Sequence, residues 1–396
     1  MIPRLLQVYL IRDANYYPVV TLTGPRQSGK TTLARAAFPE YEYVSLEDTE
    51  TRLFASEDPR GFLARYAGPA IFDEVQRVPE LFSHIQVSVD DDDRPGRYVL
   101  TGSHNFLLMR EVSQTLAGRC GILHLLPFSR AELEEQRQEE PADPRRLFAN
   151  PSTTLKLWDV IRTGFYPRIH DRKVPPEVWL ADYVQTYLSR DVRSLVNVGD
   201  LEVFERFLRL AAGRTGQLLN YSSLANDCGV SVDTARRWVS VLKTSFVVLL
   251  SPAHHRNYNK RLIRSPKLYF YDTGLACYLL GIRDTEQLQT HPLRGSLFES
   301  YIVSEAAKAY LNHRRSPPLY FWRDRTGHEV DLLIEEPSGL YPVEIKSAAT
   351  VSREMIQSLH WWCEQAGRPR DTAILIHGGL HSYDRDGVAI RPWFSI

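Results

Sequence analysis

One short segment near the start of the chain has the residue types and spacing of a phosphate-binding loop. It reads GPRQSGKTT, matches GxxxxGK(S/T), and lies between an apolar run expected to form a strand and a stretch typical of a helix. Glycines let backbone N–H groups curve around phosphate oxygens, and a helix N-terminus adds positive potential there. The residues expected to bind nucleotide phosphates are Gly24, Pro25, Arg26, Gln27, Ser28, Gly29, Lys30, Thr31 and Thr32.

Four of the expected catalytic roles follow from the chemistry of this loop and of a second strand. Lys30 reaches the β and γ phosphates, and the Thr31 hydroxyl ligates Mg²⁺. The segment AIFDE at residues 70–74 is an apolar strand that ends in two acids. Asp73 would hold the Mg²⁺ through water, and Glu74 would orient and polarise an attacking water. A small-molecule kinase needs no such glutamate, so the pair favours NTP hydrolysis.

Polar residues beyond a third strand and one arginine extend the expected catalytic set. The segment YVLTGSHN places Ser103 and Asn105 at a strand end, where either could contact the γ-phosphate or the attacking water. Ordinary turn chemistry is the alternative. Arg119, in the segment LAGR, could reach the γ-phosphate of a neighbouring subunit, and an ordinary surface ion pair is the alternative.

The loop, together with the segments FDEVQRVPELF, LTGSHN and LAGR…LLPFS, resembles the AAA+ family ATPases of bacteria and archaea. The resemblance is to the subgroup whose ATPase module precedes a C-terminal domain of unknown function. It implies ATP with Mg²⁺, an arginine finger that acts across subunits, and assembly into a homo-oligomer. The spacing of the residues does not by itself distinguish ATP from GTP.

The segment YSSLANDCGVSVDTARRWVSVLK, residues 221–243, has the spacing of two short helices around a tight turn. Gly229 supplies the turn, Ser231 caps the second helix, and the strand expected at residues 246–250 completes a winged-helix unit. This helix would enter a DNA groove, unless the unit serves only as scaffold. The side chains expected to face DNA are Thr234, Arg236, Arg237 and Ser240.

The stretch that follows, SPAHHRNYNKRLIRSPK at residues 251–267, contains five Lys or Arg residues and no acid. Such a local basic loop beside a helix-turn-helix fits contact with a phosphate backbone, and a solvated loop is the alternative. The residues assigned to DNA contact here are Arg256, Lys260, Arg261 and Arg264, and Lys267 ends the stretch.

An acidic and lysine pattern marks the last third of the chain. The runs around Asp331 and Glu344 alternate apolar and polar residues, which places Glu344 and Lys346 on the same face of a strand. Together with Glu299 of the preceding helix, this pattern resembles a PD-(D/E)XK endonuclease-like core. The resemblance implies Asp331 and Glu344 as metal ligands, Lys346 as the catalytic lysine and Glu299 as a supporting acid. Cleavage of nucleic acid, a non-cleaving nuclease-like fold and a chance match all stay open. Period two places Glu329 on the side of Asp331, where a surface charge is the simpler interpretation.

Composition sets further bounds. Lys plus Arg and Asp plus Glu both number 48, which excludes a uniformly cationic nucleic-acid coat but allows a local basic stripe. The four cysteines form no CxxC pair, so a reducing compartment is expected. The apolar start of the chain is broken by Arg12 and Asp13, and no run of about 20 apolar residues exists. We therefore expect a cytoplasmic protein without a signal peptide or membrane span.

These observations predict an α/β protein in three parts. Residues 1–140 form a P-loop AAA+ domain with a parallel sheet, residues 150–285 a helical winged-helix domain, and residues 290–396 a restriction-endonuclease-like α/β core. The charge-rich segment from Ala131 is expected to be a helix that runs into a linker. The expected function is Mg²⁺-dependent ATP hydrolysis by an oligomer that binds DNA, including structured or branched DNA. The alternatives are an ATP-gated metal-dependent nuclease and an ATP-switched protein-binding adaptor.

Overall fold

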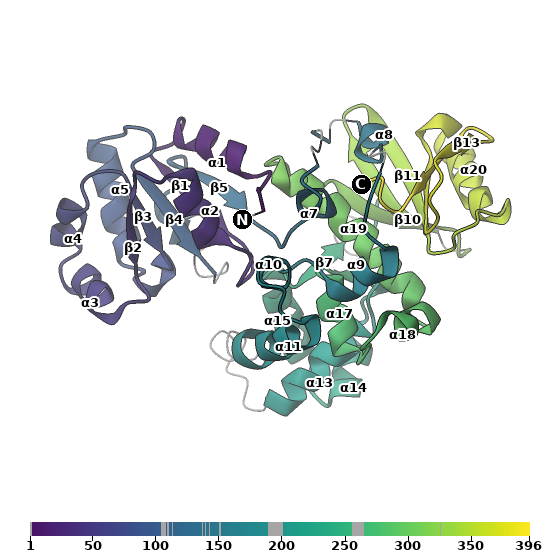
Figure 1. Cartoon of the computed structure of the whole chain (residues 1–396), viewed down its shortest axis with the longest axis horizontal. Coiled ribbons are helices and arrows are strands. Elements are labelled where there is room, and N and C mark those ends of the chain that lie inside the picture. Colours follow the sequence, from purple (N-terminus) through teal and green to yellow (C-terminus); the bar gives the residue numbers. More distant parts are fainter. Residues whose placement is uncertain are drawn as a thin grey trace.

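The computed structural model of the chain describes most of its residues, and three structured parts follow one another in it (Figure 1). The predicted site residues Asn105, Arg256, Lys260, Arg261 and Arg264 lie outside the described residues. The residues not described are 1, 104–107, 109–110, 113, 137, 139, 142, 150–151, 189–200, 256–264 and 325.

The N-terminal part is a five-stranded parallel sheet with the strand order β2-β3-β4-β1-β5. Residues on its central strands are buried on both faces, as expected for a sheet with helices on both sides. Since β4 lies between β1 and β3, its carboxyl end separates the loop after β1 from the acids after β3. The predicted parallel sheet is confirmed; its strands are β1 (Val19–Thr23), β2 (Glu42–Ser45), β3 (Ala70–Asp73), β4 (Tyr98–Gly102) and β5 (Cys120–His124).

Helices cover both faces of this sheet. Leu6, Leu10 and Leu33 pack with Val20 and Leu22 on one face, and a second cluster of aromatic and aliphatic side chains fills the other. The first face is covered by α1 (Gln7–Ala14) and α2 (Lys30–Ala37). The second face is covered by α3 (Thr49–Glu57), α4 (Pro59–Arg65) and α5 (Leu81–Asp91).

The segment after β5 begins with a helix, as expected, and the structure adds that this helix is buried. Its first turn is α7 (Arg130–Leu133), capped by a reciprocal pair of bonds between Ser129 and Glu132. Ala131 and Arg130 are both 0% exposed, so the start of this charge-rich segment is buried. The physical reason is that buried partners from distant parts of the chain satisfy its charges. A short helix, α8 (Pro144–Leu147), follows.

The middle part is mainly helical and contains a three-stranded sheet of order β6-β8-β7. Both strand pairs are antiparallel, and two helices lie between β6 and β7 in the sequence. Its elements are α9 (Leu157–Thr163), α10 (Pro167–Asp171), α11 (Pro176–Tyr183) running into the π-turn Val184–Leu188, α13 (Leu201–Ala212), β6 (Gln217–Leu218), α14 (Tyr221–Cys228), α15 (Val232–Thr244), β7 (Val248–Ser251), β8 (Lys267–Phe270), α17 (Thr273–Leu279) and α18 (Thr285–Thr290).

The two helices predicted around Gly229 are present as α14 and α15. Gly229 has φ 76°, a left-handed conformation that ends α14, and the Ser231 hydroxyl accepts a bond from the Thr234 amide at 3.1 Å. Trp238 packs edge-on against Phe204 and Phe207 of α13, with ring centroids 5.2 and 5.0 Å apart. This buried contact fixes which face of α15 points outward.

The C-terminal part is a six-stranded mixed sheet of order β13-β14-β12-β11-β10-β9. The strands β10 and β11, which carry Asp331 and Glu344, pair antiparallel. One long helix lies on each face of the sheet. The elements are α19 (Arg294–Asn312), β9 (Leu319–Arg323), β10 (Glu329–Glu336), β11 (Gly339–Lys346), α20 (Glu354–Ala366), β12 (Ile374–His377), β13 (Tyr383–Arg385) and β14 (Val388–Pro392).

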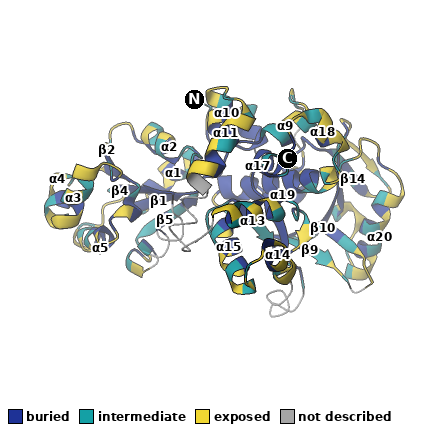
Figure 2. Ribbon diagram, turned by 90° about the horizontal axis from the view of Figure 1, so that it is seen from below, coloured by how far each residue is buried: buried dark blue, intermediate teal, exposed yellow. Residues whose placement is uncertain are grey.

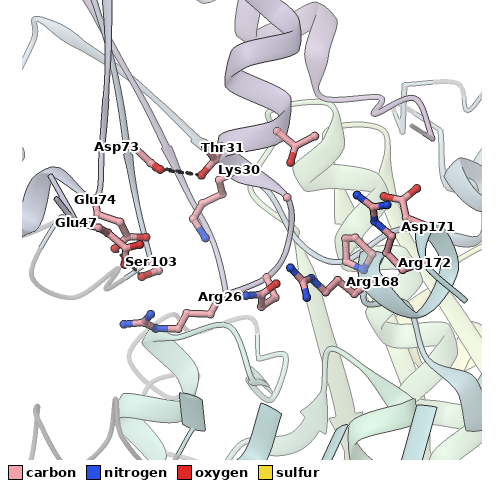
Figure 3. A pocket seen from close by; sticks show the side chains of 14 residues that line it. Arg26, Lys30, Thr31, Glu47, Asp73, Glu74, Ser103, Arg168, Asp171 and Arg172 are labelled. Carbon is pink, nitrogen blue, oxygen red and sulfur yellow. Dashed lines mark hydrogen bonds between the residues drawn. The ribbon is translucent and has the colours of Figure 1, made fainter. Parts of the chain in front are cut away.

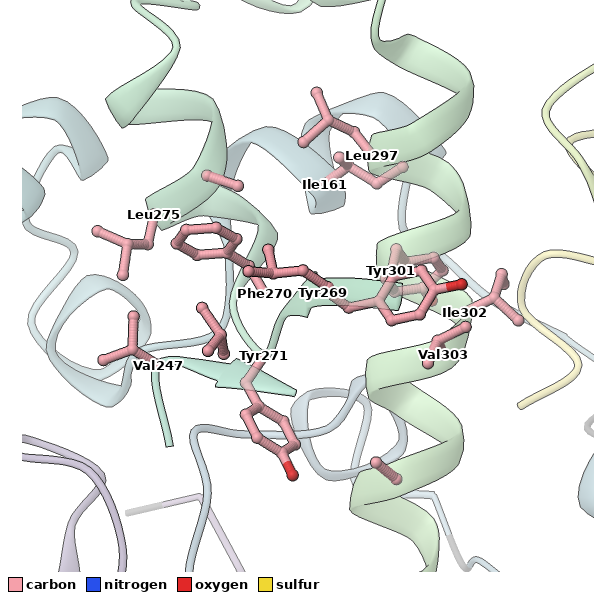
Figure 4. Packing of buried hydrophobic residues seen from close by; sticks show 14 of the residues in the cluster. Ile161, Val247, Tyr269, Phe270, Tyr271, Leu275, Leu297, Tyr301, Ile302 and Val303 are labelled. Carbon is pink, nitrogen blue, oxygen red and sulfur yellow. The ribbon is translucent and has the colours of Figure 1, made fainter. Parts of the chain in front are cut away.

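The helix α19 is buried along most of its length, and Figure 2 shows it dark blue at the centre of the molecule. Tyr269 and Phe270 of β8 pack beside Tyr301 and Ile302 of α19 (Figure 4). The same hydrophobic cluster reaches the C-terminal sheet, so the middle and C-terminal parts share one core. Among the described residues, no helix is both long and apolar enough to cross a bilayer.

A buried ion cluster ties the segment after β5 to α19. The Arg130 guanidinium donates to the Ile396 carbonyl oxygen through Nε at 3.0 Å and Nη2 at 2.8 Å, and it pairs with Glu134. The Arg130 amide donates to Glu305 at 2.7 Å, and Lys308 donates to Glu305 at 2.8 Å. Charged groups without water need such partners, because desolvation of each ion costs several kcal/mol.

Replacing Arg130 by methionine should therefore destabilise the protein strongly. The change leaves the buried Glu134 carboxylate and the Ile396 carbonyl oxygen without the guanidinium, and breaking a buried pair costs about 3–5 kcal/mol. We expect the Tm from calorimetry to fall by more than about 5 °C. The control is Arg145→Met, because Arg145 is half-exposed and pairs with Asp143 at the surface. Equal Tm values for the two variants would contradict this interpretation.

Candidate functional site

The loop at residues 24–32 is shaped by two glycine positions. Gly24 has φ 150°, and a Cβ atom there would lie 2.1 Å from the Leu125 carbonyl oxygen. Gly29 has φ 93° and immediately precedes α2. Another residue type would clash at the first position and strain the second. The glycine spacing of the motif therefore has a direct backbone cause, and it aims the amino end of α2 into the loop.

The side chains of the loop fit phosphate. Lys30 is buried, and its ammonium donates to the carbonyl oxygens of Gly24 at 3.0 Å and Pro25 at 2.8 Å. The Ser28 hydroxyl is buried, and no described group forms a hydrogen bond with it. Both donors lie where the loop curves, at the positive end of α2.

Asp73 lies at the end of β3 and accepts hydrogen bonds from three hydroxyl groups. Thr31 donates to its two carboxylate oxygens at 3.1 and 3.0 Å, Tyr43 donates at 2.8 Å, and Thr101 of β4 also donates. Burial and the bond to Asp73 raise the pKa of Tyr43 to about 12. Hard oxygen ligands of this kind suit Mg²⁺, so Thr31 and Asp73 would hold the ion, which neutralises phosphate charge when bound.

Glu74 directly follows β3 in a left-handed conformation with φ 56°. This backbone state costs a non-glycine residue about 1–2 kcal/mol. The carboxylate oxygen Oε2 accepts from Gln76 at 2.5 Å and from Ser103 at 2.9 Å. The structure thus brings Ser103 to Glu74, the predicted water-activating residue. Its predicted contact with the γ-phosphate stays a prediction.

A cleft of about 670 Å³ opens over these groups and is closed on its far side by α10 (Figure 3). Arg168 and Asp171 of α10, and Arg172 directly after it, line the cleft opposite Asp73 and Glu74. The sequence patterns did not predict these three residues. The sequence does contain a signal for them. Pro167 is typical of a helix start, and Arg168 and Arg172 have the four-residue spacing of one helix face.

The sequence patterns also did not predict Arg4, which supports the phosphate-binding loop through hydrogen bonds. Its guanidinium donates to the Ser28 carbonyl oxygen at 2.9 Å and to the Leu126 carbonyl oxygen at 2.6 Å, and pairs with Glu132 at 3.0 Å. Arg4 is 8% exposed, so these contacts are largely shielded from water. Through Glu132 of α7, the loop is connected to the segment that carries Arg130.

Arg119 lies away from the cleft of its own chain. It precedes β5, whose first residue pairs with the first residue of β1, whereas the loop follows the last residue of β1. Five residues of strand span roughly 16 Å. Its guanidinium pairs with Asp90 at the surface. A role for Arg119 therefore requires another chain, as the predicted finger acting across subunits does.

The outward face of α15 carries basic side chains. Arg236 and Arg237 are exposed, and the Arg236 guanidinium lies 4.6 Å from the centre of the Tyr221 ring. Arg237 donates to the Thr234 hydroxyl at 3.4 Å, so these predicted residues lie together, and Ser240 is exposed on the same helix. Stacking on an aromatic ring orients a guanidinium without neutralising its charge.

The predicted acidic and lysine residues of the C-terminal part also come together, with an addition. Lys346 contacts Glu344 at 2.5 Å and Asp331 at 3.3 Å. Glu299 accepts from Tyr269 at 2.6 Å and from Lys267 at 2.9 Å, both on β8. Lys267 was expected to belong to an exposed basic stretch. It is 3% exposed instead, because it turns inward to these carboxylates.

The cluster does not fit a resident metal. Burial, followed by the charge of Asp331, raises the pKa of Glu299 to about 7 and of Glu344 to about 8. Two ammonium groups, those of Lys267 and Lys346, already lie against the carboxyl groups of this cluster. In the described part of the chain, no group of three or more His, Cys, Asp or Glu residues is placed to hold a metal ion. The arrangement gives no support to Asp331 and Glu344 as metal ligands.

Comparison with known proteins assigns each part of the chain. A family model described as an AAA domain matches residues 16–134, and two models described as domains of unknown function match residues 154–286 and 294–394. The uncharacterized proteins Rv2008c of Mycobacterium tuberculosis and Mb2031c of Mycobacterium bovis are each 32% identical over 356 residues. That alignment covers 88% of this chain and 75% of theirs.

Solved structures are less similar. The Walker-type ATPase PABY2304 of Pyrococcus abyssi has a TM-score of 0.41 at 17% identity, over 69% of this chain and 94% of its own. The ADP form of the ORC2 protein of Aeropyrum pernix has a TM-score of 0.31 at 15% identity, over 62% of this chain and 85% of its own. Values this low add nothing to the assignment of the fold.

The AAA domain match, the strand order and the phosphate-binding loop define an AAA-type P-loop ATPase. The chain belongs to the family that includes the two uncharacterized mycobacterial proteins.

The position of α10 generates a prediction for Arg168. Replacing it by alanine removes a positive charge from the cleft wall, and a charge-assisted contact is worth about 1.5–3 kcal/mol. We expect the Kd for a fluorescent ATP analogue with Mg²⁺ to rise about tenfold or more. The control is Arg283→Ala, an exposed residue outside the cleft lining. Unchanged ATP binding and turnover in Arg168→Ala would show that α10 takes no part in the site.

Proposed function

We propose that the chain is a Mg²⁺-dependent ATP hydrolase that binds DNA through its middle part. The observation that carries this proposal is the shared cleft. The loop and acids of the N-terminal sheet form one wall, and α10 of the helical part forms the other. A nucleotide bound in this cleft therefore contacts both parts. Its state, ATP or ADP, would influence the position of the N-terminal part relative to the helical part.

The residues of the cleft divide the work of hydrolysis. Lys30 leaves its two carbonyl partners and binds the β and γ phosphates. The Gln76 and Ser103 bonds hold the Glu74 carboxylate through Oε2, which leaves Oε1 to accept the proton of the attacking water. Arg168 and Arg172 supply positive charge opposite the acids.

The charge that develops on the γ-phosphate calls for one more cation. We assign it to Arg119 of a neighbouring chain in a homo-oligomer, because the sheet separates Arg119 from its own cleft. Arg119 can leave its exposed ion pair with Asp90 at little cost in free energy, since surface ion pairs contribute less than about 1 kcal/mol.

DNA binding is assigned to the unit formed by α13, α14, α15 and the β6-β8-β7 sheet. Helices and strands follow one another in the order of a winged helix, and α15 is the second helix of the predicted helix-turn-helix. Thr234, Arg236 and Arg237 lie on its outward part, and the β7–β8 connection contains the basic stretch. These features support contact with phosphates rather than readout of one base sequence.

Nuclease activity is not part of the proposal. Lys267 and Lys346 neutralise the carboxylates that would hold the catalytic metal. The C-terminal part acts instead as a platform, because its helix α19 packs against β8 of the DNA-binding unit.

The test is DNA binding by the double variant Arg236→Ala/Arg237→Ala. Two phosphate contacts would be lost, so we expect affinity at low salt to fall at least tenfold and the slope of log K against log salt to weaken by about 2. Fluorescence anisotropy with duplex, single-stranded and branched DNA over a NaCl series measures both quantities.

The matched control is Arg353→Ala, which removes an exposed arginine from the C-terminal part. It should bind DNA as the unchanged protein does. Failure of the unchanged protein to bind any of the three DNAs at low salt would refute the DNA assignment. If the double variant binds DNA as tightly as the unchanged protein does, the DNA-binding site does not lie on α15.

A further inference from the structure

One buried ammonium group lies where the carboxylates of the C-terminal cluster converge. Lys267 begins β8, and its Nζ atom is 2.9 Å from Glu299, 2.5 Å from Glu329 and 4.0 Å from Asp331. These acids come from α19 and β10, whereas Lys267 comes from the sheet of the middle part. A single cation therefore joins carboxylates from two elements that are foreign to its own strand.

The contacts of Lys267 are those of an enclosed ion rather than of a surface salt bridge. Its side chain is 4% exposed, and the Glu299 and Asp331 side chains are 14% and 13% exposed. A lysine so far from water is retained only with compensating negative charge. The ammonium carries a single charge, is compact, and is surrounded by oxygen atoms, as a hard metal ion would be.

A second ammonium closes the other side of the cluster. Lys346 lies 3.3 Å from the second oxygen of Asp331 and 2.5 Å from Glu344. The remaining oxygen of Glu344 is buried, and no described group forms a hydrogen bond with it. This buried carboxylate oxygen would be available as a ligand if the Lys267 ammonium were removed.

We propose that the Lys267 ammonium occupies the cation position of this carboxylate cluster. While β8 is in place, the cluster binds no divalent metal. Removal of the ammonium opens a site for a hard divalent cation with oxygen ligands from Glu299, Asp331 and Glu329 or Glu344. This proposal is independent of ATP hydrolysis and of DNA binding.

The experiment measures Mn²⁺ binding to the full-length, nucleotide-free protein by EPR of the free ion. The variants are Lys267→Met, which keeps the apolar length of the side chain, Asp331→Asn, and the two changes combined. We expect Lys267→Met to bind one more Mn²⁺ ion per chain than the unchanged protein does. Addition of Asp331→Asn should remove that site.

Two results would overturn the proposal. The first is a Mn²⁺ site in the unchanged protein that is lost in Asp331→Asn, because the cluster would then bind metal with Lys267 present. The second is a folded Lys267→Met protein that gains no site. If Lys267→Met does not fold, the comparison of the unchanged protein with Asp331→Asn decides, since equal Mn²⁺ binding supports the proposal and a loss overturns it.

Discussion

The buried guanidinium of Arg130 is the contact on which the arrangement of the three parts depends. It lies one turn beyond the N-terminal sheet and donates to the Ile396 carbonyl oxygen, while its own amide binds Glu305 of α19. Water is excluded from these charges, since Arg130 is 0% and Glu305 1% exposed. The buried Glu305 carboxylate accepts from both the Arg130 amide and Lys308, and this contact holds α7 against α19.

The same short segment reaches the nucleotide cleft. Glu132, two residues after Arg130, holds Arg4, and Arg4 holds the Ser28 carbonyl oxygen of the phosphate-binding loop. On the other side, α19 packs against β8, whose first residue enters the carboxylate cluster. Contacts therefore run without interruption from the loop to the unit that we propose binds DNA. Together with α10 in the cleft wall, they give nucleotide state a physical connection to that unit.

The parts of the site that could be predicted are those formed by residues close together in the sequence. The loop glycines, Lys30, Thr31 and the acids after β3 have spacings that the local backbone requires, and the structure brings them to one cleft. The helix pair around Gly229 was predictable for the same reason.

The residues that were missed act through partners far away in the sequence. Arg4 and Glu132 are 128 positions apart, and Lys267 and Glu299 are 32 apart. The polar segment at Ala131 was expected to be a helix that runs into a linker, and nothing in its charge pattern reveals that distant groups enclose its first turn. Lys267 was placed in a basic surface stretch for that same reason. The burial and contacts of these residues depend on how whole helices and strands pack together, which residue type alone does not reveal.

The central claim is that ATP turnover in the cleft responds to DNA held by the middle part. The most direct measurement is the steady-state rate of ATP hydrolysis with and without duplex, branched and single-stranded DNA at low salt, with Lys30→Ala as the inactive control. The account predicts that at least one of these DNAs raises the rate and that Lys30→Ala abolishes it. A rate that is the same with all three DNAs and without DNA would contradict it.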